Sequence, residues 1–149
     1  MTLDQKIAEH LFLAIPLLHD HLIKPVESTM RYELSPMQFY TLVLLLREGC
    51  MNMTELSGYF GIPKQQMTKI INRLVEMGAV VRRDSPTDRR LVQICASEHA
   101  KDCVEKHREE VCRVIASALI ELSEEDKTRL LEAICTIKSI LPKIAIQNK

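Results

Sequence analysis

Side chains that can hydrogen-bond to bases and phosphates are concentrated on one face of a predicted helix in the middle of the chain. This helix should run from Lys64 to about Met77 and stop at Gly78. Apolar residues recur along it at steps of three and four: Met67, Ile70, Ile71, Leu74 and Met77. The opposite face carries glutamine, threonine and lysine. Glutamine can pair with adenine, lysine with guanine, and threonine with either of these bases. An ordinary solvated helix face has a similar composition, so this surface needs support from its neighbours.

A short basic hairpin follows the helix. Residues 79–83 and 91–95 have the composition of strands, and the residues between them are rich in turn formers. Arg89 and Arg90 lie at the predicted tip. Between residues 52 and 95, seven positive and four negative side chains give a net charge of +3, whereas the whole chain is neutral. The basic charge is therefore concentrated where a nucleic-acid surface would need it.

A second, shorter helix precedes the polar one. Asn52 and Glu55 form a plausible capping pair, which predicts a helix over residues 53–60, and Gly61 can end it in the left-handed conformation. Two helices joined by such a turn form a helix-turn-helix, and the hairpin that follows makes it a winged helix. Such a protein would bind double-stranded DNA by placing its recognition helix in the major groove and an arginine of the wing in the minor groove.

Other residue patterns that could carry chemistry are weak. His99, Cys103 and His107 recur every four residues and could ligate zinc in pairs, but the two histidines are about 12 Å apart along a helix axis. We therefore expect structural roles for all three and no metal site. A Gly-rich phosphate loop, a Gly-x-Ser-x-Gly elbow and an HExxH motif are all lacking, so we predict neither an enzyme nor a cofactor.

The five cysteines, at positions 50, 95, 103, 112 and 135, are odd in number and lack Cys-x-x-Cys spacing. We expect no disulfide framework, and we expect most of them to be reduced and buried as small apolar side chains. A sensing cysteine needs a lowered pKa, which Arg108 could provide for Cys112, or His99 and His107 for Cys103. Inert burial is the simpler interpretation.

Helices should make up the rest of the chain. The spacing predicts a helix over residues 3–24 that Pro16 should kink or split, and a central, buried helix over residues 36–47 that begins after Ser35. Ser97 should open a long helix to about Leu122, and Ser123 with Asp126 should cap the last one. These last helices carry long apolar stripes that one small domain cannot cover, which predicts a second subunit. The fold class is therefore mostly α with a small β hairpin.

Length and composition set further bounds. A chain of 149 residues with 46% hydrophobic residues is sufficient for one domain, and no stretch approaches the roughly 20 apolar residues that span a bilayer. The N-terminus has neither a basic start nor an apolar signal core. We therefore expect a single cytoplasmic domain over residues 1–149 with no membrane partner. The net charge of +0 argues against an indiscriminate polybasic binder.

The run from Thr54 to Ile94 resembles the MarR family of transcription regulators. The most specific part is the Asp88-Arg89-Arg90 wing, at a fixed distance after a helix that ends Leu74-x-x-x-Gly78. The resemblance extends over nearly the whole chain. One departure lies after the wing, where the family usually has Leu-Thr and then a glycine. This chain has Ala96, Ser97 and Ala100 there, so the junction could pack differently.

The resemblance implies a homodimeric winged-helix regulator of a pseudo-palindromic operator, acting as a repressor that a small-molecule effector relieves. About 1–33 and 97–149 would form the dimerisation helices, and about 34–96 the DNA-binding core. The residues that would contact DNA are Lys64, Gln65, Gln66, Thr68, Lys69, Arg73, Arg89 and Arg90. Gln65, Gln66, Thr68 and Lys69 would face bases, Arg73 a phosphate and Arg90 the minor groove. Asp88 would brace the wing by pairing with a neighbouring arginine.

The resemblance also places an effector pocket between the dimer-forming helices and the winged helix. Its expected lining is Phe12, Ile15, Met30, Tyr32, Phe39 and Tyr40, with Arg31 or a histidine to hold an anion. Two alternatives stay open. One is a winged helix that docks on another protein, and the other is a redox- or metal-responsive regulator of the same fold. Peroxide-sensing relatives carry their cysteine in the N-terminal helix, whereas this chain has none before Cys50.

Overall fold

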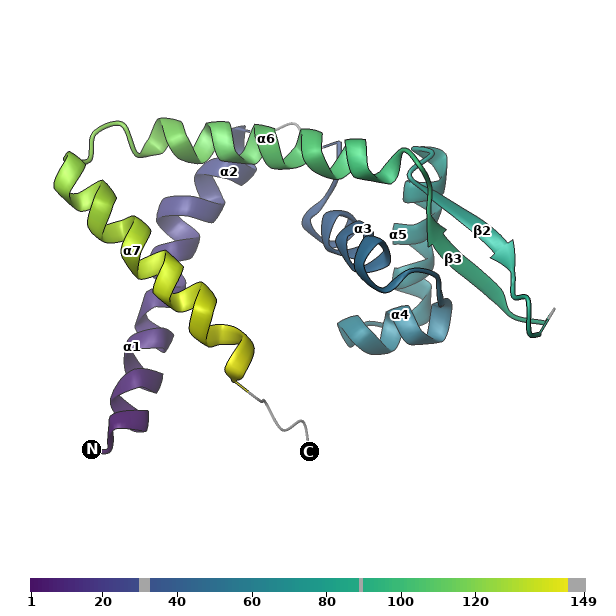
Figure 1. Cartoon of the computed structure of the whole chain (residues 1–149), viewed down its shortest axis with the longest axis horizontal. Helices are drawn as coiled ribbons and strands as arrows, with labels where there is room; N and C mark the ends of the chain where they lie inside the picture. Colours follow the sequence, from purple (N-terminus) through teal and green to yellow (C-terminus); the bar gives the residue numbers. More distant parts are fainter. Residues whose placement is uncertain (30–32, 89, 145–149) are drawn as a thin grey trace.

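The computed structural model describes residues 1–29, 33–88 and 90–144, and this part of the chain is mostly helical with a small antiparallel sheet (Figure 1). The predicted fold class, mostly α with a β hairpin in a winged helix-turn-helix, is therefore confirmed. The elements in order are α1 (Leu3–Leu18), the π-helical turn η1 (His19–Ile23), α2 (Lys24–Thr29), α3 (Pro36–Glu48), β1 (Met51–Asn52), α4 (Met53–Phe60), α5 (Lys64–Glu76), β2 (Val80–Asp84), β3 (Val92–Ala96), α6 (Ala100–Ala118), α7 (Glu124–Ile140) and the 3-10 turn η2 (Leu141–Lys143).

Side-chain caps fix the starts of several helices. Ser35 caps α3 by accepting a hydrogen bond from the Gln38 amide, with Pro36 in the first turn. Ser123 caps α7 through the amide of Asp126. Such caps satisfy backbone N–H groups that have no partner inside the helix. Both starts agree with the sequence prediction.

The N-terminal helix departs from expectation around Pro16. Pro16 does not split the helix, because α1 continues to Leu18 with this proline inside it. A π-helical turn, His19–Ile23, follows before α2. The ring of Pro16 removes one backbone donor, and the change in hydrogen-bond pattern comes three residues later, where the amide of His19 reaches the carbonyls of Ile15 and Pro16. The helical segment therefore continues through the proline.

The long helix α6 begins later and ends earlier than predicted. Ser97 does not cap it: its Oγ donates to the carbonyl of Gly78 at 2.6 Å and accepts from the amide of His99 at 3.2 Å. Ser97 therefore links the end of β3 to the end of the α5 region. The helix itself runs over Ala100–Ala118 rather than from Ser97 to Leu122. The junction is thus different from the expected one, at the point where the sequence departs from the family pattern.

The sheet has three antiparallel strands in the order β1-β3-β2. The sequence predicts the hairpin β2–β3 but not the two-residue strand β1, which pairs Met51 with Ile94. This sheet closes one side of the winged-helix core. The core consists mainly of fully buried aliphatic side chains: Leu34, Leu42, Leu44, Leu45, Leu56, Met67, Ile71, Leu74, Val80 and Ile94.

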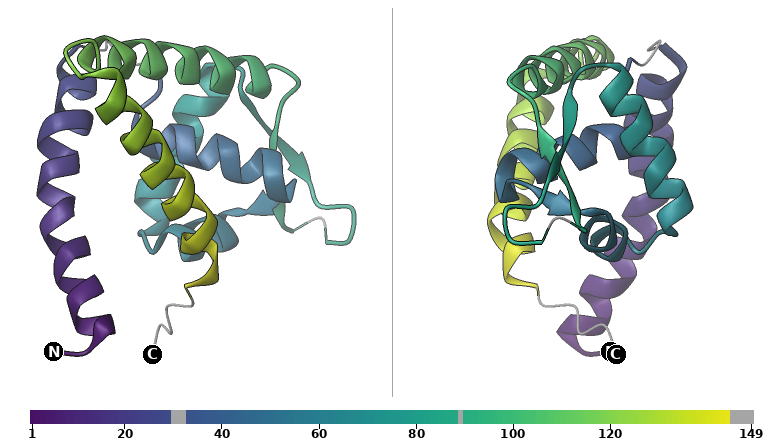
Figure 2. Two further views of the ribbon diagram at one scale, coloured as in Figure 1. Left: turned by 60° about the vertical axis from the view of Figure 1, so that its left-hand side comes forward. Right: turned by 90° about the vertical axis from the view of Figure 1, so that its right-hand side faces the viewer.

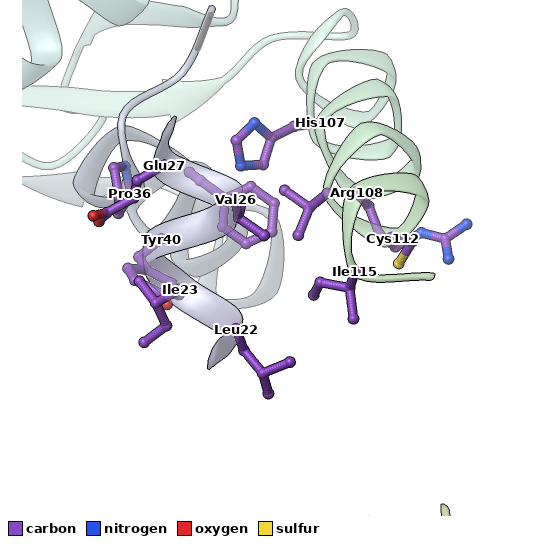
Figure 3. Close-up of a pocket in the computed structure, with 12 residues that line it drawn as sticks. Leu22, Ile23, Val26, Glu27, Pro36, Tyr40, His107, Arg108, Cys112 and Ile115 are labelled. Atoms are coloured by element: carbon purple, nitrogen blue, oxygen red, sulfur yellow. The ribbon is translucent and has the colours of Figure 1, made fainter. Parts of the chain in front are cut away.

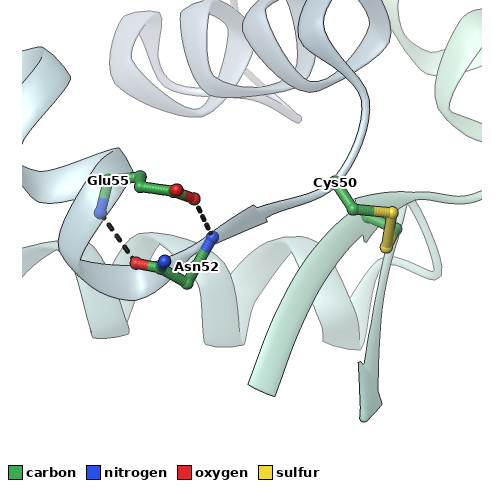
Figure 4. The surroundings of a disulfide bond; sticks show 4 residues. Cys50, Asn52 and Glu55 are labelled. Atoms are coloured by element: carbon green, nitrogen blue, oxygen red, sulfur yellow. Dashed lines mark hydrogen bonds between the residues drawn. A yellow bond between two sulfur atoms is a disulfide. The ribbon is translucent and has the colours of Figure 1, made fainter. Parts of the chain in front are cut away.

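A disulfide joins Cys50 to Cys95, with an S–S distance of 2.02 Å (Figure 4). The expectation of reduced and buried cysteines is therefore wrong for this pair. It is also wrong for Cys112 and Cys135, which are exposed, while Cys103 is half-buried. The pairing depends on β1 lying beside β3. Because a two-residue strand leaves no periodic signal in the sequence, the pairing could not be predicted.

Helices α1 and α7 lie outside this core. Figures 1 and 2 show α6 extending away from the winged helix toward the end of the molecule where α1 and α7 lie. Neither α1 nor α7 contains a buried residue. Both helices expose large apolar side chains, among them Leu3, Ile7, Leu11, Phe12, Ile15, Leu17, Leu131, Ile134, Ile137 and Ile140. Among the described residues, no helix is long and apolar enough to cross a membrane.

Candidate nucleic-acid interface

Helix α5 separates its residues into a buried and an exposed face. Met67, Ile71 and Leu74 are completely buried against the core. The polar side chains of the opposite face are in contact with solvent: Lys64, Gln65, Gln66, Lys69, Asn72 and Arg73 are exposed, and Thr68 is half-buried. The hydroxyl of Thr68 donates to the carbonyl of Lys64 at 2.8 Å. An exposed face with these side chains provides hydrogen-bond donors and acceptors of the kind that read base edges.

Helix α4 and a tight turn set the position of α5. Asn52 accepts a hydrogen bond from the amide of Glu55 at 2.9 Å, and the Glu55 carboxylate accepts from the amide of Asn52 at 2.7 Å. Gly61 ends α4 with φ at 63°, the left-handed conformation that favours glycine. Leu56 fixes α4 to the core because it is completely buried. The pair α4–α5 is thus the predicted helix-turn-helix.

The wing is joined to the recognition helix by a hydrogen bond between side chains. The Arg82 guanidinium on β2 donates to Asn72 Oδ1 on α5 at 2.5 Å. On the same helix, Arg73 forms an ion pair with Glu76 at 3.2 Å. Helical spacing places Asn72 on the polar face but does not reveal its partner, because the two residues meet only when the hairpin folds back onto α5.

The wing tip is organised by its own side chains. Ser85 is buried, at 4% exposure, and its Oγ is within 3.4 Å of the amides of Thr87 and Asp88. Asp88 Oδ1 accepts a hydrogen bond from the backbone amide of Arg90 at 2.9 Å. This contact holds the backbone of the tip and leaves the Arg90 side chain exposed. The predicted contact residue Arg89 lies outside the described residues.

A cavity of about 450 Å³ lies between α2, α3 and α6 (Figure 3). Its lining is largely apolar: Leu22, Ile23, Val26, Glu27, Pro36, Phe39, Tyr40, His107, Arg108, Val111, Cys112 and Ile115. The rings of Phe39 and His107 are in contact, with centroids 4.8 Å apart. Burial lowers the pKa of His107 below its usual value, and the nearby carboxylate of Glu110 acts in the opposite direction.

Only some of the residues expected at an effector pocket lie at this cavity. Phe39 and Tyr40 line the cavity, whereas Phe12 and Ile15 lie exposed on α1 and are not part of its wall. Met30, Arg31 and Tyr32 lie outside the described residues. Arg108 is a cationic residue at the cavity that the sequence does not assign to it, and its Nε donates to Glu105 at 3.1 Å. Over residues 1–29, 33–88 and 90–144, no three His, Cys, Asp or Glu side chains are grouped so as to hold a metal ion.

The fold and this surface define the class of protein as a winged helix-turn-helix protein. Comparison with known proteins adds the family. Residues 32–91 match the model described as the MarR family. The uncharacterized HTH-type transcriptional regulator YfiV of Bacillus subtilis (strain 168) is 27% identical over 116 residues, which are 78% of this chain and 72% of that protein.

Solved structures share the fold along the whole chain. The YusO protein from Bacillus subtilis has a TM-score of 0.66 at 20% identity, covering 97% of this chain and 100% of its own. A MarR family protein from Bacillus stearothermophilus has a TM-score of 0.66 at 22% identity, covering 95% and 99%. The predicted resemblance to the MarR family is confirmed by the match of its model to residues 32–91. The family and the fold are those of regulators rather than enzymes.

Proposed function

We propose that this protein is a homodimeric regulator that binds a pseudo-palindromic DNA operator in the cytoplasm and represses transcription until a small molecule binds. The observation that carries the proposal is the exposed polar face of α5, bonded through Asn72 to the arginine of a basic wing. This arrangement matches the way in which a recognition helix and a wing contact successive grooves.

The individual roles follow from position and chemistry. Gln65, Gln66, Thr68 and Lys69 would face base edges in the major groove, while Lys64 and Arg73 would approach phosphates. Arg73 would exchange its ion pair with Glu76 for a phosphate contact. The wing arginines, Arg89 and Arg90, would enter the minor groove, where negative potential is strongest. Asp88 supports this through its hydrogen bond to the backbone of Arg90.

The apolar faces of α1 and α7 support the dimer. Side chains such as Phe12, at 72% exposure, and Leu131, at 63%, are too exposed and too numerous for a stable isolated surface. A second copy of the chain would cover them. Two copies related by a two-fold axis would present two recognition helices to two half-sites of one operator.

The cavity between α2, α3 and α6 supports relief by an effector. It connects elements of the dimerisation region with the first helix of the winged-helix core, so a ligand there can alter the angle between the two. A ligand that binds better to dimers with mismatched wing spacing would shift the population away from the DNA-binding form. The apolar lining favours a mostly apolar molecule.

The experiment that tests DNA binding is a selection followed by a salt titration. A duplex selected from a random-sequence pool by the wild-type protein is labelled, and affinity is measured by fluorescence anisotropy at several salt concentrations. We expect log K to fall steeply with log salt. Arg73→Ala should reduce the slope by about one unit, because the variant no longer neutralises a phosphate, and Lys69→Ala should lower the affinity for the selected duplex through a lost base contact. Arg113→Ala, an exposed arginine of α6, serves as the matched control.

The competing function, docking of the winged helix on another protein, predicts a different result. In that case no sequence would be enriched from the pool, and any binding to duplex would be independent of Lys69 and Arg73. Binding that shows no dependence on salt would contradict the DNA proposal.

A probe for the cavity is the apolar dye 1-anilinonaphthalene-8-sulfonate. We expect its fluorescence to rise on binding and the labelled duplex to be released at the same dye concentrations. Val111→Trp, which fills the cavity, should abolish both effects. Dye binding that is unchanged in this variant would place the dye on another apolar surface.

A further inference from the structure

The disulfide Cys50–Cys95 closes a loop that contains the whole proposed DNA-contacting surface. The two cysteines are 45 residues apart in sequence, and α4, α5, β2 and the wing lie between them. Cys50 precedes β1, and Cys95 lies within β3. The bond therefore links the strand that leads into the helix-turn-helix to the returning strand of the wing (Figure 4).

The pair is in register in the folded sheet. β1 and β3 pair Met51 with Ile94 and Asn52 with Gln93, so Cys50 and Cys95 are the next directly opposed pair. Their Cα atoms are 4.3 Å apart, close to the spacing of a non-hydrogen-bonded antiparallel pair. The pairing of the two strands therefore already places the two cysteines opposite each other.

The two cysteine residues differ in their exposure to solvent. Cys50 is exposed to solvent, whereas Cys95 is 4% exposed. A reagent can therefore reach the pair through Cys50, while Cys95 is held opposite as the second thiol. This is the arrangement of an attacking cysteine with a partner that resolves the mixed disulfide.

From this geometry we propose that Cys50 and Cys95 form a reversible thiol–disulfide site whose oxidised state strengthens DNA binding. Its reactants are small-molecule disulfides and thiols. The Cys50 thiolate attacks a disulfide RSSR, giving Cys50–S–SR and one thiolate RS⁻. The Cys95 thiolate then displaces the second RS⁻, and two electrons have passed from the protein to RSSR. Two small thiols reverse both steps. The effect on DNA rests on the proposed function.

The link to DNA binding runs through α4. β1 ends at Asn52, which is also the N-cap of α4, so no residue separates the strand from the helix. Movement of β1 relative to β3 therefore moves the start of α4 relative to the wing. In the oxidised form the disulfide fixes the position of β1 relative to β3. In the reduced form only the two residue pairs of the sheet hold β1 to β3. A preorganised surface loses less entropy on binding, so oxidation should raise the affinity for DNA.

The test uses a protein in which the exposed cysteines have been removed, C112S/C135S. The half-buried Cys103 is retained because burial raises the pKa of its thiol and makes it less reactive. The protein is equilibrated in buffers with different ratios of reduced to oxidised glutathione. Free thiols are counted by the gel shift of a maleimide-linked polymer, and affinity for the selected duplex is measured by anisotropy in the same samples.

We expect loss of two thiols in one step as the buffer becomes oxidising, reversal on reduction, and an affinity about tenfold higher in the oxidised form. Cys50→Ser in the same background should bind like the reduced protein at every ratio. Circular dichroism of this variant checks that it folds, and because position 50 is exposed, serine should be tolerated.

Failure to form the bond in any glutathione buffer would overturn the proposal. Equal affinity in both states, or tighter binding by the reduced protein, would overturn the claim that oxidation strengthens DNA binding. A protein that loses and regains the two thiols but enriches no duplex in either state would instead contradict the proposed function, so the two failures are distinguishable.

Discussion

Arg90 is exposed at the end of a wing whose backbone is held by Ser85 and Asp88. Because its side chain is exposed, Arg90→Ala should leave the melting temperature unchanged. It should lower the affinity for the selected duplex by about tenfold, because the narrow minor groove attracts an inserted arginine through its negative potential. Anisotropy and circular dichroism measure the two quantities.

The matched control is Arg113→Ala, which removes an arginine that is exposed on α6. Unchanged affinity in Arg90→Ala would exclude Arg90 from the interface. A fall in melting temperature would instead show that the guanidinium supports the wing.

His107 provides a pH test of the cavity. Burial lowers its pKa below the ordinary 6.5, so the folded protein favours the neutral ring. As the pH falls through about 6.5, the unfolded chain takes up a proton that the folded chain does not. The free energy of unfolding should therefore decrease below that pH, until the folded ring is protonated as well.

Urea denaturation at several pH values measures this effect. His107→Gln should make the slope between about pH 7 and 5 shallower, while His10→Gln on the exposed face of α1 is the matched control. An identical slope in both variants would mean that His107 is not the titrating group.

At the scale of elements, caps and turns explain what the sequence could predict. The bounds of α4 follow from Asn52, Glu55 and Gly61, which are all close in sequence, and the predicted helix over 53–60 is the helix observed. The apolar stripe of α5 was likewise readable, since Met67, Ile71 and Leu74 repeat at helical spacing. Local signals were sufficient for these two helices, whereas the expected cap at Ser97 failed because its hydroxyl donates to the distant carbonyl of Gly78.

Features that depend on distant partners were missed. β1 exists because Met51 pairs with Ile94, and the disulfide depends on that pairing. The hydrogen bond from Arg82 to Asn72 also forms only after the hairpin folds back. Phe12 was expected at a pocket, but it lies exposed on α1, for the same reason. Helical spacing tells which face of α1 is apolar, but not whether a cavity or a second subunit covers it.

The cap of α4 gives a prediction at this scale. Asn52→Ala removes the acceptor for the Glu55 amide, so it should lower the free energy of unfolding by about 1 kcal/mol. Asn52→Asp keeps an acceptor and should retain most of the stability. Urea denaturation under reducing and oxidising conditions measures the loss. Equal stability of the alanine variant and the wild type would show that the cap is replaced by water.

At the scale of the whole molecule, the winged helix has a dense core while α1 and α7 have none. Helix α6 connects the two regions, and the cavity lies where α2 and α3 approach it. The isolated chain therefore consists of a winged helix with its own buried core and of helices α1 and α7, which contain no buried residue. The exposed apolar side chains of α1 and α7 are the surface that the proposed second copy would cover.

This arrangement predicts how assembly depends on α7. Ile137 is 48% exposed on α7, and Ile137→Glu would place a charge in the proposed contact between two copies. We expect a dimer at micromolar concentration for the wild type, and at least a tenfold increase in the dimer dissociation constant for the variant. Sedimentation velocity over a concentration series measures both. Lys138→Glu, at a polar position of the same helix, is the matched control.

Weaker dimerisation should also weaken DNA binding, because two half-sites bind two recognition helices at once. The Ile137→Glu variant should therefore lose affinity for the full selected duplex while retaining its weak binding to a half-site.

Deleting residues 123–149 removes the whole of α7 and should give an insoluble or unfolded chain. A well-folded monomer, either from the wild type at micromolar concentration or from this deletion, would contradict the dimer and leave the exposed faces of α1 and α7 without an explanation.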